Sequence, residues 1–345
     1  MSVLALETSC DDTCAAVIDA NGAIRSNVIS SQQAHDRFGG VVPEIASRHH
    51  LELVNLVVAR ALEQAGTELA HIELVAATQG PGLVGALLVG LSTAKALAAA
   101  RELPLAPVDH LQGHIAANFL HAAAGPFEPP FVCLIASGGH TLLGLVSGHH
   151  SYEVLGSTLD DAAGEAFDKG ARMLGLGYPG GAALERLAAG GDPQAFAFPG
   201  SAAERGRGGR GARSRAFAEG LDFSFAGLKT ALLYKLRELG AEEAQARAAD
   251  LAASYQAAIV DALVLRAERA LQRAGVERLA VGGGVAANGE LRRRLRELGA
   301  TVHVPERELC TDNAAMIASA ARFGPRLAYP DYLGLDAYAS GERRP

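Results

Sequence analysis

The stretch FVCLIASGGHTLLGLVSGHHSYEVLGS, residues 131–157, decides the fold of this chain. Apolar runs within it are separated by short polar or glycine turns, and this pattern predicts strands at 131–137, 141–147 and 152–157. The N-terminus begins in the same way, with strands predicted at 3–9, 14–20 and 23–30. A repeated three-stranded start predicts two related α/β lobes.

The elements that follow each start are repeated as well. The first half continues with an amphipathic helix from Pro43 to Gln64, and the second half with a helix that begins at Asp160. Each half then has a strand, a glycine turn, a helix and a last strand, and these strands are expected at 73–79, 105–110, 278–284 and 301–305. Ligands in open α/β sheets bind beyond the carboxyl ends of the strands, so we expect a cleft at these glycine turns.

The lobe boundaries follow from the two starts. Residues 1–121 are expected to form the first lobe and residues 131–324 the second, and the segment from about 325 to 345 is expected to pack back on the first. Three prolines in residues 122–130 predict a connector. Residues 199–220 are rich in glycine and arginine, a composition typical of a mobile surface loop.

The composition is that of a soluble globular protein. Hydrophobic residues make up 49% of the 345 positions and charged residues 20%, and the net charge of -7 does not indicate a general nucleic-acid binder. The N-terminus lacks the basic region of a signal peptide, and no apolar stretch reaches the length of about 20 residues that spans a membrane. Four cysteines without a CxxC pair suit a reducing compartment. We therefore expect a cytoplasmic enzyme with no membrane partner.

Two histidines stand four residues apart in VDHLQGHIAANFL, residues 107–119. His110 and His114 would share one face of a helix, and this spacing indicates a metal site if a third ligand exists. A zinc peptidase needs a glutamate directly after the first histidine, where this chain has Leu111. Asp312 is a candidate third ligand, because it also follows a late strand of its lobe and could meet the histidines across the cleft. Its alternative role is to cap the apolar helix that follows.

Glycine turns lie near the ends of several predicted strands and helices. The turns at 137–140, 178–181 and 282–288 have backbone N–H groups that could hold a phosphate, although each alone is an ordinary tight turn. The chain has neither a Walker loop nor a GxGxxG motif, which argues against P-loop and Rossmann sites. Together the turns favour a nucleotide-type ligand. Asp168 lies two turns into a predicted helix, where it is better placed to meet such a ligand than to cap the helix.

Asp11 and Asp12 occupy the predicted turn between the first two strands. An ordinary hairpin turn accounts for them. In an enzyme with a cleft, however, this turn would face the ligand, and one carboxylate would act as a base or orient a nucleophile. The two aspartates are therefore the candidate catalytic residues.

Arginines are concentrated in two places on this acidic chain. Contacts to a phosphate backbone require such clusters, although most charge runs are solvated surface. The first cluster lies in the predicted loop 199–220 and the second on one predicted helix; they consist of Arg205, Arg207, Arg210, Arg213 and Arg215, and of Arg292, Arg293, Arg294 and Arg296.

Nine motifs along the chain together resemble one family. In order they are ETSCDDT, GGVVPEIASRHH, GPGLVGALLVG, HLQGH, SGGHT, DDAAGEAFDKGARMLGLGYPGG, LDFSFAGLKTA, GGGVAANGELR and CTDNAAMIA. The series is similar to the TsaD family, the bacterial tRNA N6-adenosine threonylcarbamoyltransferases that were once labelled glycoproteases. The resemblance implies an α/β fold of the two-lobed, actin-like (ASKHA, RNase H-like) class, duplicated around a central cleft.

The resemblance also implies an activity and partners. The enzyme would transfer the threonylcarbamoyl group from threonylcarbamoyl-AMP to N6 of adenosine 37 in tRNAs that read codons beginning with A, and AMP would leave. A TsaB-like paralogue and a TsaE-like ATPase would be its protein partners, and a TsaC-type enzyme would supply the threonylcarbamoyl-AMP.

Site residues follow from the same resemblance. The metal ligands of the family correspond to His110, His114 and Asp312, which would hold one divalent ion, Fe2+ or Zn2+. The family's contacts to nucleotide and substrate correspond to Ile135, Ala136, Ser137, Gly138, Gly139, Asp168, Gly181 and Asn288. This chain departs from the family at Asp12, where relatives often have glutamate. Ile135 stands where archaeal and eukaryotic relatives have a tyrosine metal ligand, which indicates the bacterial type.

Three other functions share some of these features. A sugar- or acetate-kinase-like enzyme of the same fold would use the glycine turns but has no need for the two histidines and Asp312. A metallopeptidase would need the missing glutamate beside His110. A scaffold paralogue without activity would be expected to have lost the histidines, which this chain retains.

Overall fold

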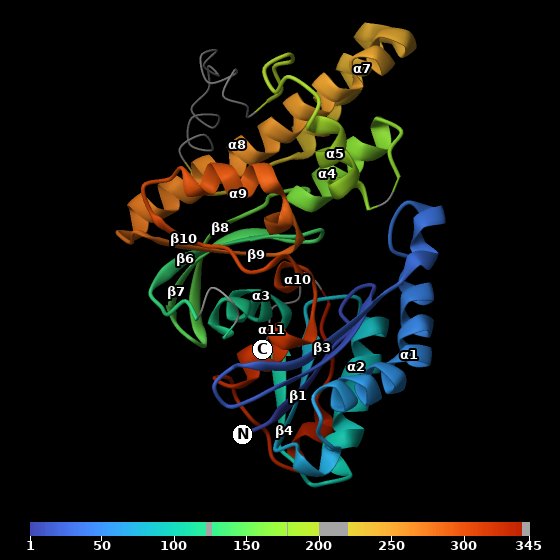
Figure 1. The fold of residues 1–345 in the computed structure, drawn as a ribbon, viewed down its shortest axis with the longest axis vertical. Coiled ribbons are helices and arrows are strands. Elements are labelled where there is room, and N and C mark those ends of the chain that lie inside the picture. Colours follow the sequence, from blue (N-terminus) through green and yellow to red (C-terminus); the bar gives the residue numbers. More distant parts are fainter. Residues whose placement is uncertain (122–125, 178, 200–219, 340–345) are drawn as a thin grey trace. The chain divides into compact units, whose positions relative to one another are not determined.

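The computed structural model describes residues 1–121, 126–177, 179–199 and 220–339. These residues belong to two compact units (Figure 1). Unit 1 consists of Met1–Pro129, Gly148–Ser151 and Pro305–Pro345, and unit 2 of Pro130–Ser147 and Tyr152–Val304. The arginine cluster of the predicted loop lies outside the described residues; it comprises Arg205, Arg207, Arg210, Arg213 and Arg215.

Unit 1 is built on a five-stranded sheet. Its strand order is β3-β2-β1-β4-β5, in which the first three strands are antiparallel and β4 and β5 run parallel to β1. The strands are β1 (Val3–Glu7), β2 (Asp12–Ile18), β3 (Ile24–Ser31), β4 (Leu74–Gly80) and β5 (Leu105–Asp109). The predicted strands of the first half are therefore confirmed. Asp12, which was predicted in the turn, is instead the first residue of β2.

Helices cover the sheet of unit 1. Two of them, α1 (Pro43–Gln64) and α2 (Val84–Ala99), lie side by side (Figure 1) and share an apolar core with the sheet. Leu4 and Leu6 of β1 belong to this core. Side chains alternate along a strand, so Glu7 points to the opposite face. The remaining helices of the unit are α3 (His110–Ala116), α10 (Arg307–Cys310) and α11 (Ala314–Ala321), with 3-10 helices η1 (Gln33–Phe38), η2 (Leu69–His71), η3 (Ala117–Phe119) and η5 (Asp331–Gly334).

Unit 2 repeats this sheet. Its order is β8-β7-β6-β9-β10, and the central strand β6 pairs antiparallel with β7 and parallel with β9. The strands are β6 (Phe131–Ala136), β7 (Thr141–Gly148), β8 (Ser151–Ser157), β9 (Arg278–Gly282) and β10 (Thr301–His303). Strands β6 to β10 thus take the places that β1 to β5 have in unit 1. The duplication predicted from the sequence is confirmed.

The helices of unit 2 include the longest described helix, α8 (Ala248–Ala274). Its Tyr255 is fully buried and donates a hydrogen bond of 3.0 Å to the carbonyl of Ala166. Among the described residues, α8 alone is long and apolar enough to cross a membrane, but 72% of that stretch is buried, as in a core helix. The other helices are α4 (Ala163–Met173), α5 (Gly180–Ala188), α7 (Ala226–Ala246), α9 (Gly289–Arg296) and the 3-10 helix η4 (Gly284–Ala287).

Two boundaries differ from those expected. The helix predicted to begin at Asp160 begins at Ala163, because the Asp160 carboxylate accepts hydrogen bonds from the backbone of Phe225 and Ala226 at the start of α7. Residues 305–324, expected in the second lobe, group with unit 1. The reason is that α11 packs against β1, β2 and α3.

Candidate metal centre and substrate-binding residues

The structure brings His110, His114 and Asp312 together within unit 1. The two histidines lie one turn apart on α3, and their rings meet edge to face with centroids 4.7 Å apart. Asp312 Oδ1 lies 3.6 Å from His110 Nε2 and 3.3 Å from His114 Nε2. One ligand atom from each of the three side chains can be chosen so that all lie within 4.8 Å of one another. Both histidines are buried, while Asp312 is partly open to solvent.

The cap of α11 leaves the carboxylate of Asp312 available. Asn313 is the N-cap residue, and its side chain accepts a hydrogen bond of 3.0 Å from the Met316 backbone N–H. Capping by Asp312, the alternative considered from the sequence, is therefore wrong. Because its neighbour caps the helix, Asp312 can turn its side chain to the histidines.

Glu7 forms a further layer behind His110. This carboxylate at the end of β1 has no solvent exposure, and its Oε2 lies 3.1 Å from His110 Nδ1. Ser9 Oγ lies 3.2 Å from the same nitrogen. These contacts engage Nδ1 and direct Nε2 towards Asp312, as outer partners of metal-binding histidines commonly do. Glu7 was not predicted from the sequence; the available signal was an acidic residue at the end of an apolar strand.

Burial and charge act in opposite directions on this pair. Burial by itself would lower the pKa of His110, but the charges of Asp312 and Glu7 raise it to about 9. Burial by itself would raise the pKa of Glu7, but the charge and hydrogen bond of His110 hold it below its usual value. At neutral pH the metal-free pair is therefore ionic, and a metal ion would replace the proton on Nε2.

His114 tests whether a metal ion fits here. The side chain is almost fully buried, and among the described residues Nδ1 has no hydrogen-bond partner, while the carboxylate of Asp312 lies 3.3 Å from Nε2. A buried imidazole whose nitrogens are not both hydrogen-bonded is costly, and ligation of a metal by one nitrogen would remove part of that cost. Two imidazoles and a carboxylate also form a common donor set for divalent transition metals. The residues present thus fit a metal ion.

The turn that ends at Asp11, directly before Asp12 of β2, is held by residues that were not predicted from the sequence. His50 on α1 contacts the carbonyl of Cys10 through Nε2 at 3.0 Å and the hydroxyl of Thr13 through Nδ1 at 2.8 Å. The Gln32 backbone N–H donates to the carbonyl of Asp11 at 3.2 Å. A histidine inside an apolar helical face was the available signal for this network.

Asp12 has an unusual electrostatic environment. Burial raises its pKa to about 7, against the effect of a hydrogen bond with Ser31, and the negative charges of Asp312, Asp11 and Glu7 add to the rise. A carboxylate that titrates near neutrality is suited to accept a proton under physiological conditions.

The predicted substrate residues lie in unit 2. Ile135 and Ala136 are buried at the end of β6, and Ser137 begins the turn to β7, in which its backbone and hydroxyl bond to the backbone of His140. The start of α4 packs against this turn, where the Gly164 N–H donates to the Ser137 carbonyl at 3.0 Å. Unit 2 therefore contains this part of the predicted site, and unit 1 contains the metal cluster.

Three further predicted residues connect helices of unit 2. Asp168 accepts a hydrogen bond of 2.8 Å from the backbone of Gly180, so it ties α4 to the start of α5, where Gly181 lies. Asn288 is the N-cap of α9 and accepts from Leu291 N–H at 2.9 Å. Its amide nitrogen donates to Gln256 at 2.9 Å. Both ends of the Asn288 side chain thus have structural partners.

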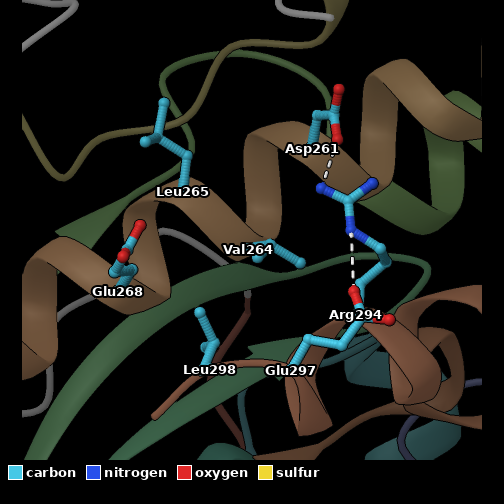
Figure 2. Close-up of a pocket in the computed structure, with 7 residues that line it drawn as sticks. All are labelled: Asp261, Val264, Leu265, Glu268, Arg294, Glu297 and Leu298. Atoms are coloured by element: carbon cyan, nitrogen blue, oxygen red, sulfur yellow. Dashed lines mark ion pairs between the residues drawn. The ribbon is translucent and has the colours of Figure 1, made fainter. Parts of the chain in front are cut away.

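Two arginines of the second cluster form ion pairs. On α9, Arg293 pairs with Glu290 and Glu297, and Arg294 lies 2.9 Å from Asp261. Figure 2 shows Arg294 between Asp261 and Glu297 in the wall of a pocket of about 200 Å³. Its charged lining consists of three carboxylates and one guanidinium. The excess of negative charge would repel a phosphate group. None of the predicted site residues is among those that line it, namely Asp261, Val264, Leu265, Glu268, Arg294, Glu297 and Leu298.

Two solved structures share the fold at low sequence identity. Component A of (R)-2-hydroxyglutaryl-CoA dehydratase from Acidaminococcus fermentans has a TM-score of 0.54 and 12% identity, over 94% of this chain and 97% of that chain. Full-length HypF, in a phosphate- and nucleotide-bound form, has a TM-score of 0.56 and 15% identity, over 93% of this chain and 54% of that chain. The predicted actin-like fold class is confirmed.

Sequence comparison identifies the family. A family model for TsaD, tRNA N6-adenosine threonylcarbamoyltransferase, matches residues 23–319. The tRNA N6-adenosine threonylcarbamoyltransferase of Symbiobacterium thermophilum is 50% identical over 341 residues, which cover 97% of this chain and 95% of the relative. That of Trichlorobacter lovleyi is 48% identical over 345 residues, with coverages of 99% and 96%. The chain belongs to the TsaD family.

Proposed function

We propose that this chain transfers the threonylcarbamoyl group from threonylcarbamoyl-AMP to N6 of adenosine 37 in tRNAs that read codons beginning with A. The reaction forms threonylcarbamoyladenosine and releases AMP. Family membership over nearly the full length supports the activity. The observation that carries the chemistry is the buried cluster of His110, His114 and Asp312.

One divalent metal ion, Fe2+ or Zn2+, is proposed for this cluster. Imidazole and carboxylate ligands suit both metals, so the donor set does not choose between them. When bound, the ion supplies Lewis-acid polarisation of a substrate oxygen. Within the protein, Glu7 and Ser9 hold the Nδ1 side of His110, and this leaves Nε2 as the ligand atom.

The turn after β6 is proposed to hold the adenylate. A Cβ at Gly138 or Gly139 would meet no described atom within 4 Å, and neither residue has a positive φ. Neither packing within the described residues nor backbone conformation therefore demands glycine here. Close approach of a ligand to the backbone is a third reason for glycine, and exposed N–H groups in such a turn stabilise phosphate oxygens.

Asp12 is proposed as the base that accepts the proton from the attacking N6 amine, with Asp11 as the residue that orients it. The support is the position of Asp12 at the start of β2, with Asp11 directly before it, and the raised pKa of Asp12. A carboxylate with a pKa near the working pH is ionised in a large fraction of molecules and still binds a proton well, and a general base needs both properties.

The protein partners and location are also proposals. A TsaB-like paralogue and a TsaE-like ATPase are expected to assemble with this chain, by analogy with its family. A cytoplasmic location is proposed because tRNA is the acceptor and the four cysteines of the chain are free thiols. Purification from the native cell, with recovery of both partners in the soluble fraction, tests these points; recovery of the chain without either partner would contradict the assembly.

A reconstituted reaction tests the proposed activity. The purified chain, its partners, threonylcarbamoyl-AMP and tRNA are incubated, and the tRNA is digested for nucleoside mass spectrometry. We expect Asp312→Ala to lower transfer by roughly 100-fold or more, since the loss of outer partners alone commonly costs 10–100-fold. Bound metal, measured in parallel, should fall with it, while tRNA binding should persist.

Asp331→Ala is the matched control, because it removes an exposed aspartate of the same unit. It should leave transfer and metal content unchanged. Wild-type transfer by the Asp312→Ala protein would contradict the metal-centred chemistry. Phosphorylation of a small substrate from ATP, without tRNA modification, would instead indicate a kinase.

A further inference from the structure

The C-terminal segment of the described chain is tied closely to the sheet of unit 1. Lys95 on α2 donates to the carbonyls of Leu333 and Leu335, and Gln79 Nε2 donates to the carbonyl of Asp336 at 2.9 Å. The Tyr338 N–H in turn donates to the carbonyl of Gln79 at 3.2 Å. These contacts fix the path of the backbone from residue 333 to residue 338.

Gly80 makes this close approach possible. A Cβ at Gly80 would lie 2.5 Å from the Tyr338 carbonyl oxygen and 2.8 Å from its ring. Such distances are far inside normal contact, so any other residue at position 80 would displace the segment. The absence of a side chain at Gly80, at the end of β4, therefore makes room for Tyr338.

Tyr338 reaches the residue that starts the metal-ligand helix. Its hydroxyl lies 2.6 Å from Asp109 Oδ2 and 2.9 Å from the Gly80 carbonyl oxygen. The single hydroxyl proton favours the nearer, charged acceptor. The other oxygen of Asp109 accepts from the backbone N–H groups of Leu111 and Gln112, at 2.9 and 3.1 Å, and so caps α3. One carboxylate thus joins the C-terminal segment to α3.

The cap matters because α3 is short. It has seven residues, and isolated helices of that length are not stable in water. Its first residue, His110, follows Asp109 directly, and His114 lies one turn later. A rotation of the Asp109 carboxylate would therefore tilt the first turn and move both imidazoles relative to Asp312.

We propose that Tyr338 is a positioning residue for the metal centre, acting through Asp109 on the orientation of α3. The inference rests on the proposed metal site at His110, His114 and Asp312. The contact that carries the effect is the hydrogen bond from the Tyr338 hydroxyl to Asp109 Oδ2. The hydrogen bond from Tyr338 holds the Asp109 carboxylate in the orientation that caps α3.

Cobalt binding to the full-length protein tests this proposal. Metal-free wild type and Tyr338→Phe are titrated with Co2+, whose visible absorption reports both affinity and coordination geometry. We expect the Kd of Tyr338→Phe to rise by roughly tenfold, the low end of the 10–100-fold effect of outer-shell partners, and its absorption bands to shift. Circular dichroism verifies that the variant is folded.

Tyr332→Phe is the matched control. Tyr332 lies in the same segment and is fully buried, but its hydroxyl has no hydrogen-bond partner among the described residues. Loss of that hydroxyl should leave the Co2+ affinity and spectrum unchanged. An equal effect of both substitutions would overturn the specific role of Tyr338 in favour of a general loosening of the segment.

A double-mutant cycle examines the route through Asp109. If Tyr338 acts through this carboxylate, the double variant Asp109→Ala with Tyr338→Phe should bind Co2+ about as weakly as Asp109→Ala alone. Additive effects, or wild-type binding by Tyr338→Phe, would overturn the inference. Failure of the wild-type protein to bind Co2+ would refute the metal site itself, and the inference with it.

Discussion

At the scale of single residues, Glu7 sets the tautomer of His110 in the candidate metal centre. It is fully buried, and its carboxylate accepts hydrogen bonds from Thr78 Oγ1 and the Ser9 backbone while it faces His110 Nδ1. An ionised carboxylate can only accept, so it requires the His110 proton on Nδ1. The Nε2 lone pair is then free for a metal. If the cluster binds a metal ion, as we propose, Glu7 would leave Nε2 of His110 as the ligand nitrogen.

Glu7→Gln should weaken metal binding by about 10–100-fold. A glutamine can donate from its amide to Nδ1, which favours the tautomer with the proton on Nε2, the nitrogen that should bind the metal. Chelator competition with Zn2+ measures the change. Glu73→Gln makes the same chemical change at an exposed position and should have no effect. Equal affinities for Glu7→Gln and wild type would refute the assigned role.

Asp12 should give the reaction a defined pH dependence. A base must be deprotonated to act, so the rate of transfer should rise with pH and level off above an apparent pKa at or below about 7. A bound cation near Asp12 would move that pKa downward. Single-turnover rates between pH 5 and 9 measure the profile, a range wide enough to bracket it.

The two aspartates can be separated with conservative variants. Asp12→Asn should lower the rate and remove the inflection, because an amide cannot accept the proton. Asp11→Asn should lower the rate but keep the inflection of the pH–rate profile. The reverse pattern would assign the proton transfer to Asp11.

At the scale of elements, α1 is the candidate surface for the TsaB-like partner. One face of this helix packs in the core of unit 1 through Val54, Val57, Val58 and Ala61, so α1 does have a packing role within its unit. Leu51 and Leu56 of the same helix are nevertheless exposed, at 68% and 48%. Large apolar side chains with this exposure on a helix are typical of a binding surface when a partner covers them.

Leu51→Glu with Leu56→Glu should abolish recovery of the TsaB-like partner without unfolding the chain. New charges on an interface would lose their hydration on binding, whereas on an exposed face they cost little. Pull-down and thermal unfolding measure the two effects. The control is Val154→Glu with Leu159→Glu, which introduces the same charges at exposed apolar positions of unit 2. Retained binding by the α1 variant would exclude this helix as the interface.

At the scale of the whole molecule, the two units share one topology but differ in chemistry. In unit 1, Asp11 ends the turn after the central strand and Asp12 begins β2, while the counterpart turn in unit 2 carries Ser137, Gly138 and Gly139. Duplication thus provides two equivalent positions at the carboxyl ends of central strands. In unit 1 this position has carboxylates, and in unit 2 it has a glycine turn, which we propose as the phosphate-binding turn.

The arginine-rich segment 199–220 is expected to act on tRNA affinity alone. The acidic chain has a net charge of -7, and the arginines of α9 are largely engaged in ion pairs or backbone contacts. If the five arginines of the segment contact phosphates, their neutralisation should weaken tRNA binding. It should also flatten the salt dependence by roughly one log-slope unit per lost contact.

Binding of tRNA at several salt concentrations, to wild type and to a protein lacking the segment, measures this effect. Affinity for the adenylate should stay constant, because phosphate-backbone contacts do not involve that ligand. Asp312→Ala is the complementary control, with tRNA binding retained and transfer lost. An unchanged salt slope after deletion would show that the segment does not contact tRNA.

The sequence by itself determined the elements, their duplication and the pairing of His110 with His114. Strands and helices follow from local periodicity, and two residues four apart on a helix share a face wherever that helix packs. Asp312 could be proposed from its place after a late strand. The motifs also identified the family, because nine short patterns in the same order are not expected to occur by chance in an unrelated chain.

Only the tertiary structure decided which distant residues surround those histidines. Glu7, His50 and Tyr338 reach the site or its supports from β1, α1 and the C-terminal segment, and no local pattern relates their positions to residue 110. Hydrogen bonds also decided between alternatives that propensity leaves equal, as when Asn313 rather than Asp312 capped α11. Propensity depends on neighbours along the chain, whereas a buried polar group takes its partners from whatever packing brings within reach.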